Sequence, residues 1–447
     1  MMYHTEPARK TPVLDKTDVL VVGSGPAGLS AALSAARSGA DTMILERYGC
    51  FGGNITQAMV GTIAWYRRKQ TVDAGGIGVE LEKRAGEMDA SLPDPEGDAE
   101  LLDSDMFKYV ADLLIEEAGV RPLLHCMVVD VVMEGNAVKG VVTESKSGRR
   151  VILAERIIDA TGDADVAFRA GAPYMMEDVD RLMQVTTSFG ISGVDTKRFL
   201  EHVKEKPASI SDWADHTSGK EDDVFTTYLA EPFQKARAAG EIPEDATIFG
   251  YWDGLTDAGE ATHINVAHVF QIDCTDVRDL TRAEITGRRY AVWAARAMKK
   301  YTPGFEKSRL RTLCSSIGTR ESRKITCEYT ITEQDVKNQA RFDDSIGICP
   351  EFLDAYKVVI LPTTGRYFQL PYRVMVPKKV ENLLVAGRCV SADRIAFAAT
   401  RQMMCCTVTG QGAGAAAAES VRQDVPLRQV DIRNVQAELR NQGVRIH

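Results

Sequence analysis

Glycine and acidic residues near the start of the chain have the spacing of a nucleotide-phosphate site. Residues 23–28 read Gly-Ser-Gly-Pro-Ala-Gly, and the acidic Glu46 follows them. Glycines at these positions allow a tight turn and let the backbone approach a pyrophosphate, while the carboxylate accepts both hydroxyls of an adenosine ribose. The spacing therefore predicts a dinucleotide site, with contacts from Gly23, Gly25, Pro26, Ala27, Gly28 and Glu46.

A second group of residues has the chemistry for proton transfer. In the run Thr262–Phe270, strand alternation would place His263 and Asn265 on one face, and His268 on the opposite, mostly apolar face. We expect His263 and Asn265 to hydrogen-bond a substrate carbonyl or to donate a proton, and His268 to lie in the core. Tyr251 is a further candidate for handling the proton, with simple packing as the alternative.

The predicted dinucleotide site requires a strand, a helix and a second strand. Asp18–Val22 is an uninterrupted apolar run, as expected for a parallel strand buried on both faces. An alanine-rich helix over Leu29–Ser38 and a strand over Thr42–Leu45 follow. Residues 1–16 lack apolar periodicity, so we expect a flexible tail there.

Later segments resemble the flavoproteins of the glutathione reductase superfamily. The resemblance rests on the glycine pair after Glu46, on 155–163 with its Ala-Thr-Gly, on the β-meander of 125–142 and on the strand 382–388. It implies that the dinucleotide is FAD. The chain departs from the family at Arg388, where these enzymes usually carry an acid, and we expect Arg388 to contact the pyrophosphate instead. The further FAD contacts that the resemblance implies are Arg47, Gly52, Gly53, Asn54, Val128, Ala160, Thr161, Gly162, Gly387, Arg388, Met403 and Met404.

Four segments taken together are similar to the FAD-dependent oxidoreductases related to fumarate reductase and succinate dehydrogenase flavoprotein subunits. They are 160–165 (ATGDAD), 320–323 (RESR), 371–373 (PYR) and 387–414. The resemblance places a helix beginning near Arg401 with its N-terminus toward the flavin. Arg401 would contact the flavin pyrimidine edge or the substrate, or else form a surface ion pair. The arginines of 309–324 would clamp an anionic substrate or, as we favour, form an ion-pair network.

The expected fold is α/β, with a Rossmann-like FAD-binding domain made of a parallel sheet and a β-meander. Residues 17–173 and 370–447 would form this domain, and an inserted α+β substrate domain would occupy 174–369. In the insert we expect strands over Gln184–Ile191 and His263–Ile272 and a helix over Thr281–Tyr301. Thr281 and Glu284 have the spacing of a capping box at the start of that helix.

Composition excludes several classes of protein. The net charge is −9, which argues against nucleic-acid binding, and no apolar run is long enough for a membrane span. Nine cysteines without a Cys-x-x-Cys pair argue against a metal centre and indicate a reducing, cytoplasmic location. The neighbouring Cys405 and Cys406 are therefore expected to be small buried thiols.

These patterns predict an FAD-dependent dehydrogenase or reductase that transfers a hydride between a small organic substrate and flavin N5. The sequence leaves open a flavin monooxygenase that uses NAD(P)H, and the flavin subunit of an electron-transfer complex. NAD(P)H is a possible electron partner and a homo-oligomer is possible.

Overall fold

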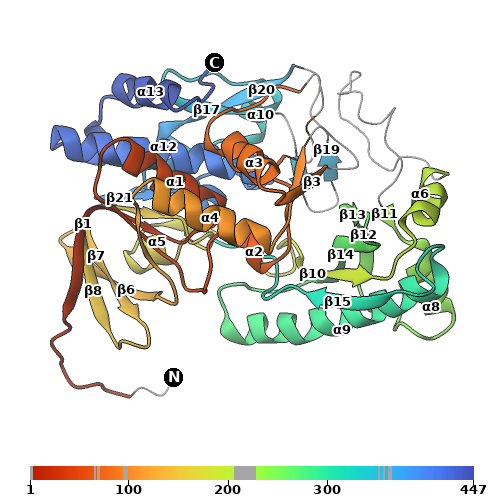
Figure 1. Ribbon diagram of the computed structural model, residues 1–447. Coiled ribbons are helices and arrows are strands. Elements are labelled where there is room, and N and C mark those ends of the chain that lie inside the picture. Colours follow the sequence, from red (N-terminus) through yellow and green to blue (C-terminus); the bar gives the residue numbers. More distant parts are fainter. Residues whose placement is uncertain are drawn as a thin grey trace.

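The computed structural model describes residues 4–64, 67, 71–93, 99–205, 228–350, 353–355, 358–360 and 365–447. Two sheets lie side by side, and helices cover their faces (Figure 1). The first sheet combines parallel strands with a β-meander, and the second is antiparallel. The fold class is therefore α/β, as the sequence predicts.

The first sheet has the strand order β5-β2-β1-β8-β7-β6, and β21 also pairs with β8. Strands β5, β2, β1, β8 and β21 are parallel, whereas β6, β7 and β8 form an antiparallel meander. Because β21 comes from near the end of the chain, the polypeptide returns to this sheet after building the second one. The bounds are β1 (Val13–Val22), β2 (Thr42–Leu45), β5 (Arg121–Leu123), β6 (Met127–Glu134), β7 (Ala137–Glu144), β8 (Arg150–Asp159) and β21 (Leu383–Val385).

The first strand is longer than predicted. It begins at Val13 rather than Asp18, because its backbone already pairs with β8 there, with Val13 opposite Val151 and Thr17 opposite Ala154. Val13 and Leu14 remain exposed, so this half of the strand has no buried apolar pattern that the sequence could reveal. The prediction of a flexible tail over residues 1–16 is therefore wrong for residues 13–16, which belong to β1.

The second sheet has the order β11-β12-β14-β10-β15, with β13 paired to β14. The long helix α9 (Val277–Tyr301) lies along one face of it (Figure 1). Two of its strands were predicted: β10 corresponds to Gln184–Ile191, shifted by one residue, and β14 to His263–Ile272, shifted by three. The other four strands were not predicted. The bounds are β10 (Val185–Ser192), β11 (Tyr228–Leu229), β12 (Ile248–Tyr251), β13 (Gly254–Thr256), β14 (Glu260–Val269) and β15 (Arg309–Leu313).

Helix α9 begins four residues before the predicted start. Asp276 is its N-cap and accepts hydrogen bonds from the backbone N–H groups of Arg278 and Asp279. Thr281 instead donates its hydroxyl to the carbonyl of Val277, inside the first turn. The predicted capping box at Thr281 is therefore wrong, because an aspartate upstream satisfies the free N–H groups first.

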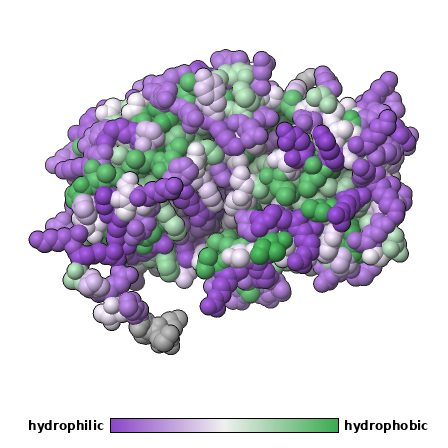
Figure 2. Space-filling model, turned by 60° about the horizontal axis from the view of Figure 1, so that its bottom comes forward, coloured by the Kyte–Doolittle hydropathy of each residue, from purple (hydrophilic) through white to green (hydrophobic). Residues whose placement is uncertain are grey.

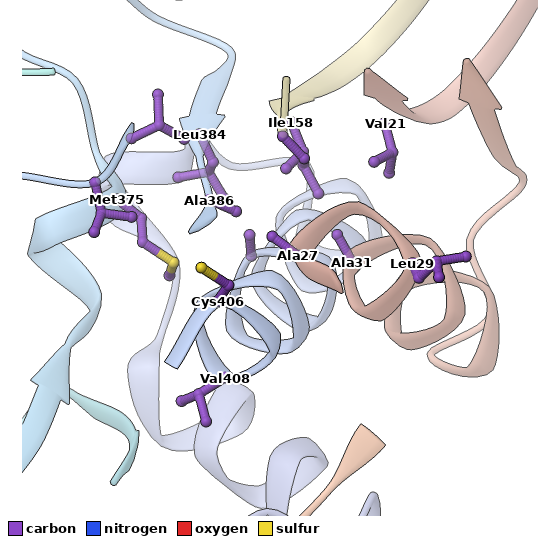
Figure 3. Packing of buried hydrophobic residues seen from close by; sticks show 14 of the residues in the cluster. Val21, Ala27, Leu29, Ala31, Ile158, Met375, Leu384, Ala386, Cys406 and Val408 are labelled. Atoms are coloured by element: carbon purple, nitrogen blue, oxygen red, sulfur yellow. The ribbon is translucent and has the colours of Figure 1, made fainter. Parts of the chain in front are cut away.

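Helix α1 (Pro26–Arg37) packs directly on α12 (Met403–Gln423), backbone against backbone (Figure 3). A Cβ at Gly410 would stand 2.1 Å from the carbonyl oxygen of Ala27, and one at Gly414 would stand 2.3 Å from that of Ala31. The two glycines, one helical turn apart, therefore allow an approach that any side chain would block. This packing holds the N-termini of both helices at the same end of the first sheet.

The other elements flank the two sheets. A shorter helix, α11, precedes α12 and was not predicted. The remaining bounds are α2 (Asn54–Gln57), α3 (Ile77–Glu87), β3 (Ser91–Pro93), β4 (Glu100–Leu102), α4 (Met106–Glu117), α5 (Asp165–Arg169), β9 (Tyr174–Met175), α6 (Thr196–Lys204), α8 (Glu231–Ala238), β16 (Lys324–Ile325), α10 (Glu333–Lys337), β17 (Ser345–Pro350), β18 (Leu353–Ala355), β19 (Val358–Ile360), β20 (Tyr367–Pro371), α11 (Arg394–Thr400) and α13 (Ile432–Asn441).

On the face shown in Figure 2, hydrophilic residues predominate and hydrophobic ones lie in small groups among them. Among the described helices, none is both long enough and apolar enough to cross a membrane.

Candidate active site

A cavity of about 410 Å³ lies where the two sheets meet. The carboxyl ends of β1, β2 and β8 and the N-terminal ends of α1 and α12 form one side. Leu280 and Glu284 of α9, together with Ser316, Ile317 and Thr319, close the other side. Ligands of α/β proteins bind at this edge of the parallel strands, outside their carboxyl ends.

The glycine turn between β1 and α1 forms one end of the cavity. Gly23 has φ +93°, and a Cβ there would stand 2.5 Å from the carbonyl oxygen of Ala160. Gly25 and Gly53 face each other, and a Cβ on Gly53 would stand 2.7 Å from Cα of Gly25. No side chain caps α1, so its first N–H groups are free to bind an anion.

Glu46 is buried beside this turn. One carboxylate oxygen accepts hydrogen bonds from the backbone N–H and the hydroxyl of Ser24, at 3.0 and 2.6 Å. The other accepts from the N–H of Tyr48 at 3.0 Å. Glu46 therefore holds the glycine turn in place while it lines the cavity, and each oxygen keeps lone pairs for a further donor.

Arg388 provides a positive charge in the cavity wall. Its Nη2 donates to Asp163 at 2.9 Å, and it reaches over Gly162, where a Cβ would stand 2.6 Å from Nη2. Its Nη1 is buried without a hydrogen-bond partner among the described residues. A buried guanidinium donor without a partner costs free energy, which indicates a polar ligand at this position.

The N-terminus of α12 forms the far end of the cavity. Met403 and Cys406 line it, and no side chain caps the helix. Burial raises the pKa of the Cys406 thiol to about 12, so this thiol is neutral at pH 7. Positive potential at this end therefore comes from the helix dipole and from Arg401, which also lines the cavity.

Arg401 forms a largely buried ion pair. Its Nη2 donates to the carbonyl and to a carboxylate oxygen of Asp354, at 2.6 and 2.5 Å. The Arg401 side chain is 10% exposed, so the alternative of a surface ion pair does not describe it.

Most of the residues expected to bind FAD line this cavity. Gly28, Gly52 and Met404 do not line it and lie behind the wall. Gly28 packs against the backbone of Gly23, Gly52 donates its N–H to Ser24, and Met404 packs against Gly78. The residues in the wall are Gly23, Gly25, Pro26, Ala27, Glu46, Arg47, Gly53, Asn54, Val128, Ala160, Thr161, Gly162, Gly387, Arg388 and Met403.

His263 and Asn265 do not form the predicted pair. A bulge in β14, with φ +53° at His263, breaks the strand alternation between them. The ring of His263 contacts the hydroxyls of Ser104 and Thr262, whereas Asn265 accepts from Arg320 at 3.3 Å. Neither residue is among those that line the cavity, and neither is Tyr251 of β12.

Residues that the sequence did not indicate complete the wall. Ser24 lies inside the glycine motif, and its hydrogen bonds to Glu46 follow from the turn geometry. Leu280 and Glu284 come from α9, and Cys274 and Thr319 come from segments outside the helices and strands; all four reach the cavity only through the tertiary fold. No local pattern identifies residues of this second kind.

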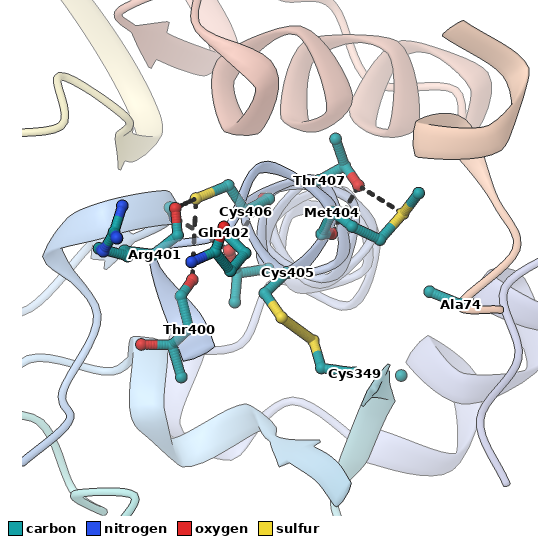
Figure 4. Close-up of a disulfide and its surroundings, with 12 residues drawn as sticks. Ala74, Cys349, Thr400, Arg401, Gln402, Met404, Cys405, Cys406 and Thr407 are labelled. Carbon is teal, nitrogen blue, oxygen red and sulfur yellow. Dashed lines mark hydrogen bonds between the residues drawn. A yellow bond between two sulfur atoms is a disulfide. The ribbon is translucent and has the colours of Figure 1, made fainter. Parts of the chain in front are cut away.

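The structure joins Cys405 to Cys349 of β17 in a disulfide (Figure 4). Their Cα atoms are 5.7 Å apart, within the normal range for such a bond. The prediction of a free thiol at Cys405 is therefore wrong, whereas Cys406 is a buried free thiol as expected. The disulfide ties the start of α12, and hence this end of the cavity, to β17.

The donors in the cavity wall fit FAD. Two uncapped helix N-termini, the partnerless Nη1 of Arg388 and the close approach of Gly25 and Gly53 suit a pyrophosphate and a flavin ring. Within the described ranges, no group of three His, Cys, Asp or Glu side chains is placed to hold a metal ion.

A family model described as FAD dependent oxidoreductase matches residues 18–439. A thiamine thiazole synthase of Methanococcus vannielii is 34% identical over 171 residues, which are 34% of this chain and 59% of that protein. The chain thus spans little more than half the length of these curated relatives.

Two further matches illustrate the range of proteins involved. The 6-methylpretetramide 4-monooxygenase of Streptomyces rimosus is 32% identical over 177 residues, 35% of this chain and 41% of that protein. A geranylgeranyl bacteriochlorophyll reductase-like protein of Thermoplasma acidophilum matches in structure at 14% identity with a TM-score of 0.47, covering 96% of this chain and 83% of that one.

Proposed function

This chain belongs to the FAD dependent oxidoreductase family, and we propose that it is a dehydrogenase or reductase that transfers a hydride between a small organic substrate and N5 of FAD. When bound, FAD supplies the redox chemistry, and the protein positions the substrate and moves protons. The glycine turn, Glu46 and Arg388 would hold the adenosine and pyrophosphate parts. Gly53, Gly387 and Met403 would hold the flavin end.

The observation that carries this proposal is the uncapped N-terminus of α12 in the cavity wall, next to Arg401. Two-electron reduction places negative charge on the flavin ring. Positive potential fixed at that end of the cavity stabilises this charge without reorganisation, which favours reduction of a flavin bound there.

A flavin monooxygenase is the second candidate. The match to the Streptomyces rimosus monooxygenase over about a third of the chain supports this alternative. In that reaction, NAD(P)H reduces the flavin and oxygen then hydroxylates the substrate, so oxygen consumption is coupled to product.

Anaerobic mixing of the FAD-loaded protein with NADPH, and separately with NADH, tests the proposal while the visible flavin band is followed. Bleaching identifies the nicotinamide as electron donor, and reoxidation by an organic acceptor without oxygen supports a reductase. No bleaching, combined with bleaching by an organic substrate, supports a dehydrogenase. Reoxidation only by oxygen, with hydroxylated product, would establish the monooxygenase instead.

A further inference from the structure

Asp163 joins the wall of the cavity to a segment that follows the last strand of the second sheet. One oxygen of its carboxylate, Oδ1, accepts two hydrogen bonds: Ser322 Oγ donates at 2.6 Å and Arg388 Nη2 donates at 2.9 Å. Asp163 and Arg388 line the cavity, whereas Ser322 is 1% exposed and is not among the lining residues. The three side chains therefore form a chain of hydrogen bonds that leads into the cavity wall.

The segment that carries Ser322 is anchored on both sides of this residue. Glu321 accepts a hydrogen bond from the backbone N–H of Met183 at 3.1 Å and another from Lys324 Nζ at 2.8 Å. Glu321 and Lys324 are almost completely buried, and the ammonium group of Lys324 lies 4.7 Å from the ring centre of Phe397. Separating a buried ion pair would leave two uncompensated charges, so these contacts hold Ser322 in one position.

Arg323 fixes the backbone of Asp163. Its Nη1 donates to the carbonyl oxygen of Asp163 at 3.0 Å and lies 3.4 Å from a carboxylate oxygen of Asp165. The guanidinium lies 4.0 Å from the ring centre of Phe168 in α5, and the side chain is only 9% exposed. Two neighbouring residues, Ser322 and Arg323, thus hold both the side chain and the main chain of Asp163.

The orientation of Arg388 depends on this arrangement. Its Nη2 is bound to Asp163, while its Nη1 is buried and has no hydrogen-bond partner among the described residues. An arginine side chain has considerable rotational freedom, and a ligand that must first order it binds more weakly. A carboxylate that is itself held in place removes part of this cost, because the guanidinium is already oriented when the ligand arrives.

We propose that Ser322 is a positioning residue for the cofactor: it orients Asp163, and Asp163 orients Arg388 toward the pyrophosphate of FAD. Arg323 supports the same carboxylate through its backbone. The Arg-Glu-Ser-Arg segment 320–323 would then serve cofactor binding through its serine, in contrast to the clamp on an anionic substrate that the sequence left open. This inference rests on the proposed function, because it places the pyrophosphate of FAD beside Arg388.

The test is a double-mutant cycle on the dissociation constant for FAD, measured by equilibrium dialysis. Ser322→Ala removes the hydroxyl and should weaken FAD binding by roughly three- to tenfold. In the Arg388→Met background the same change should alter the dissociation constant by less than about twofold, because the group that Ser322 positions is gone. A second cycle, with Asp163→Ala in place of Arg388→Met, should give the same result.

Ser308→Ala is the matched control, because Ser308 is an equally buried serine whose hydroxyl has no hydrogen-bond partner among the described residues. It should bind FAD as the native protein does. Ser322→Thr keeps the hydroxyl and should bind FAD more tightly than Ser322→Ala does. Circular dichroism and thermal unfolding show whether each variant folds, and Ser322→Cys, with its weaker donor, replaces Ser322→Ala if the latter does not.

Native FAD affinity in Ser322→Ala would overturn the proposal. So would an equal loss of affinity in the native and Arg388→Met backgrounds, because Ser322 would then act independently of Arg388. Binding by Ser322→Thr as weak as that by Ser322→Ala would overturn it too, since the hydroxyl would not be the group that matters.

The cycle measures binding alone, which separates this inference from the proposed reaction. A native protein that binds no FAD would refute the proposed function itself. The expected cycle in a protein that transfers no hydride would leave the positioning role of Ser322 standing and refute hydride transfer.

Discussion

Gly410 of α12 lies directly against the backbone of Ala27 in α1, so closely that a Cβ on the glycine would stand 2.1 Å from the Ala27 carbonyl oxygen. This contact sets the distance between the two helices whose N-termini line the cavity. Gly414, one helical turn further along α12, makes the same close contact with the backbone of Ala31. The shape of the cofactor site therefore depends on packing well inside the domain.

Gly410→Ala should destabilise the protein although alanine favours helices. The added methyl group meets a backbone oxygen that cannot move without shifting α1, and overpacking of this kind costs about 1–3 kcal/mol. The temperature of thermal unfolding and the fraction of protein that retains FAD should both decrease. Gly86→Ala in α3 is the control, because its Cβ would meet only Ser91 Oγ at 3.7 Å, and a gain of up to about 1 kcal/mol is expected. Equal stability of the two variants would contradict the packing argument.

Arg388→Met should weaken FAD binding by roughly ten- to a hundredfold, the usual effect of losing a charged hydrogen bond. The change also leaves the carboxylate of Asp163 without its cation, near the place where the pyrophosphate would lie. The dissociation constant from equilibrium dialysis with FAD measures the effect. Arg289→Met, an exposed change on α9, should bind FAD as the native protein does. If Arg388→Met bound FAD with the affinity of the native protein, Arg388 would not be part of the FAD site.

The Cys349–Cys405 disulfide should be visible as a thiol count. Under denaturing conditions without reductant the chain should show seven free thiols, and nine after reduction. Loop-closure entropy for cysteines separated by 56 positions in the sequence predicts a loss of up to about 4 kcal/mol in the free energy of unfolding of Cys349→Ser. Nine thiols before reduction would show that the bond does not form.

The buried His263 should make the protein less stable in mild acid. Burial lowers the pKa of His263 to about 4, whereas the unfolded chain takes up this proton near pH 6.5. Between these values the unfolded state binds more protons, so stability falls as the pH decreases from about 6.5 to about 4, by up to about 3 kcal/mol for this residue. His263→Gln lacks this contribution, so its urea-unfolding free energy should depend less on pH than that of the native protein.

Glu82 should have the opposite effect and serves as the comparison. Burial raises its pKa to about 7, against the partly opposing charge of Arg67. The contribution of Glu82 to the free energy of unfolding is therefore full below about pH 4.5, and it is lost as the pH rises toward 7. Glu82→Gln should gain stability relative to the native protein across that interval. If lowering the pH changed the unfolding free energy of both variants, relative to that of the native protein, in the same direction, the assignment of one of the two groups would be wrong.

The elements around the glycine motif were predictable because their signals are local. The turn of Gly23–Gly28 and the strand Thr42–Leu45 follow from residue order, from glycine geometry and from buried apolar runs. The start of β1 was missed because Val13–Lys16 joins the sheet through backbone pairing while its side chains stay largely exposed.

The substrate side of the cavity was less predictable, for a different reason. The pairing of His263 with Asn265 assumed an unbroken alternation, and a single residue with positive φ removed it. The ion pair of Arg401 with Asp354 joins residues far apart in the chain, which only the tertiary fold brings together. The apolar periodicity of a sequence does not indicate long-range packing or irregular backbone.

The proposed function requires that this cavity hold FAD and that the bound flavin accept two electrons. An anaerobic dithionite titration of the purified protein tests it most directly, with FAD content and the visible spectrum recorded at each addition. We predict one FAD per chain and a flavin band that bleaches in a single step as two electrons are added. A protein that cannot be loaded with FAD, or a bound flavin that does not bleach after two electrons have been added, would contradict the proposed function.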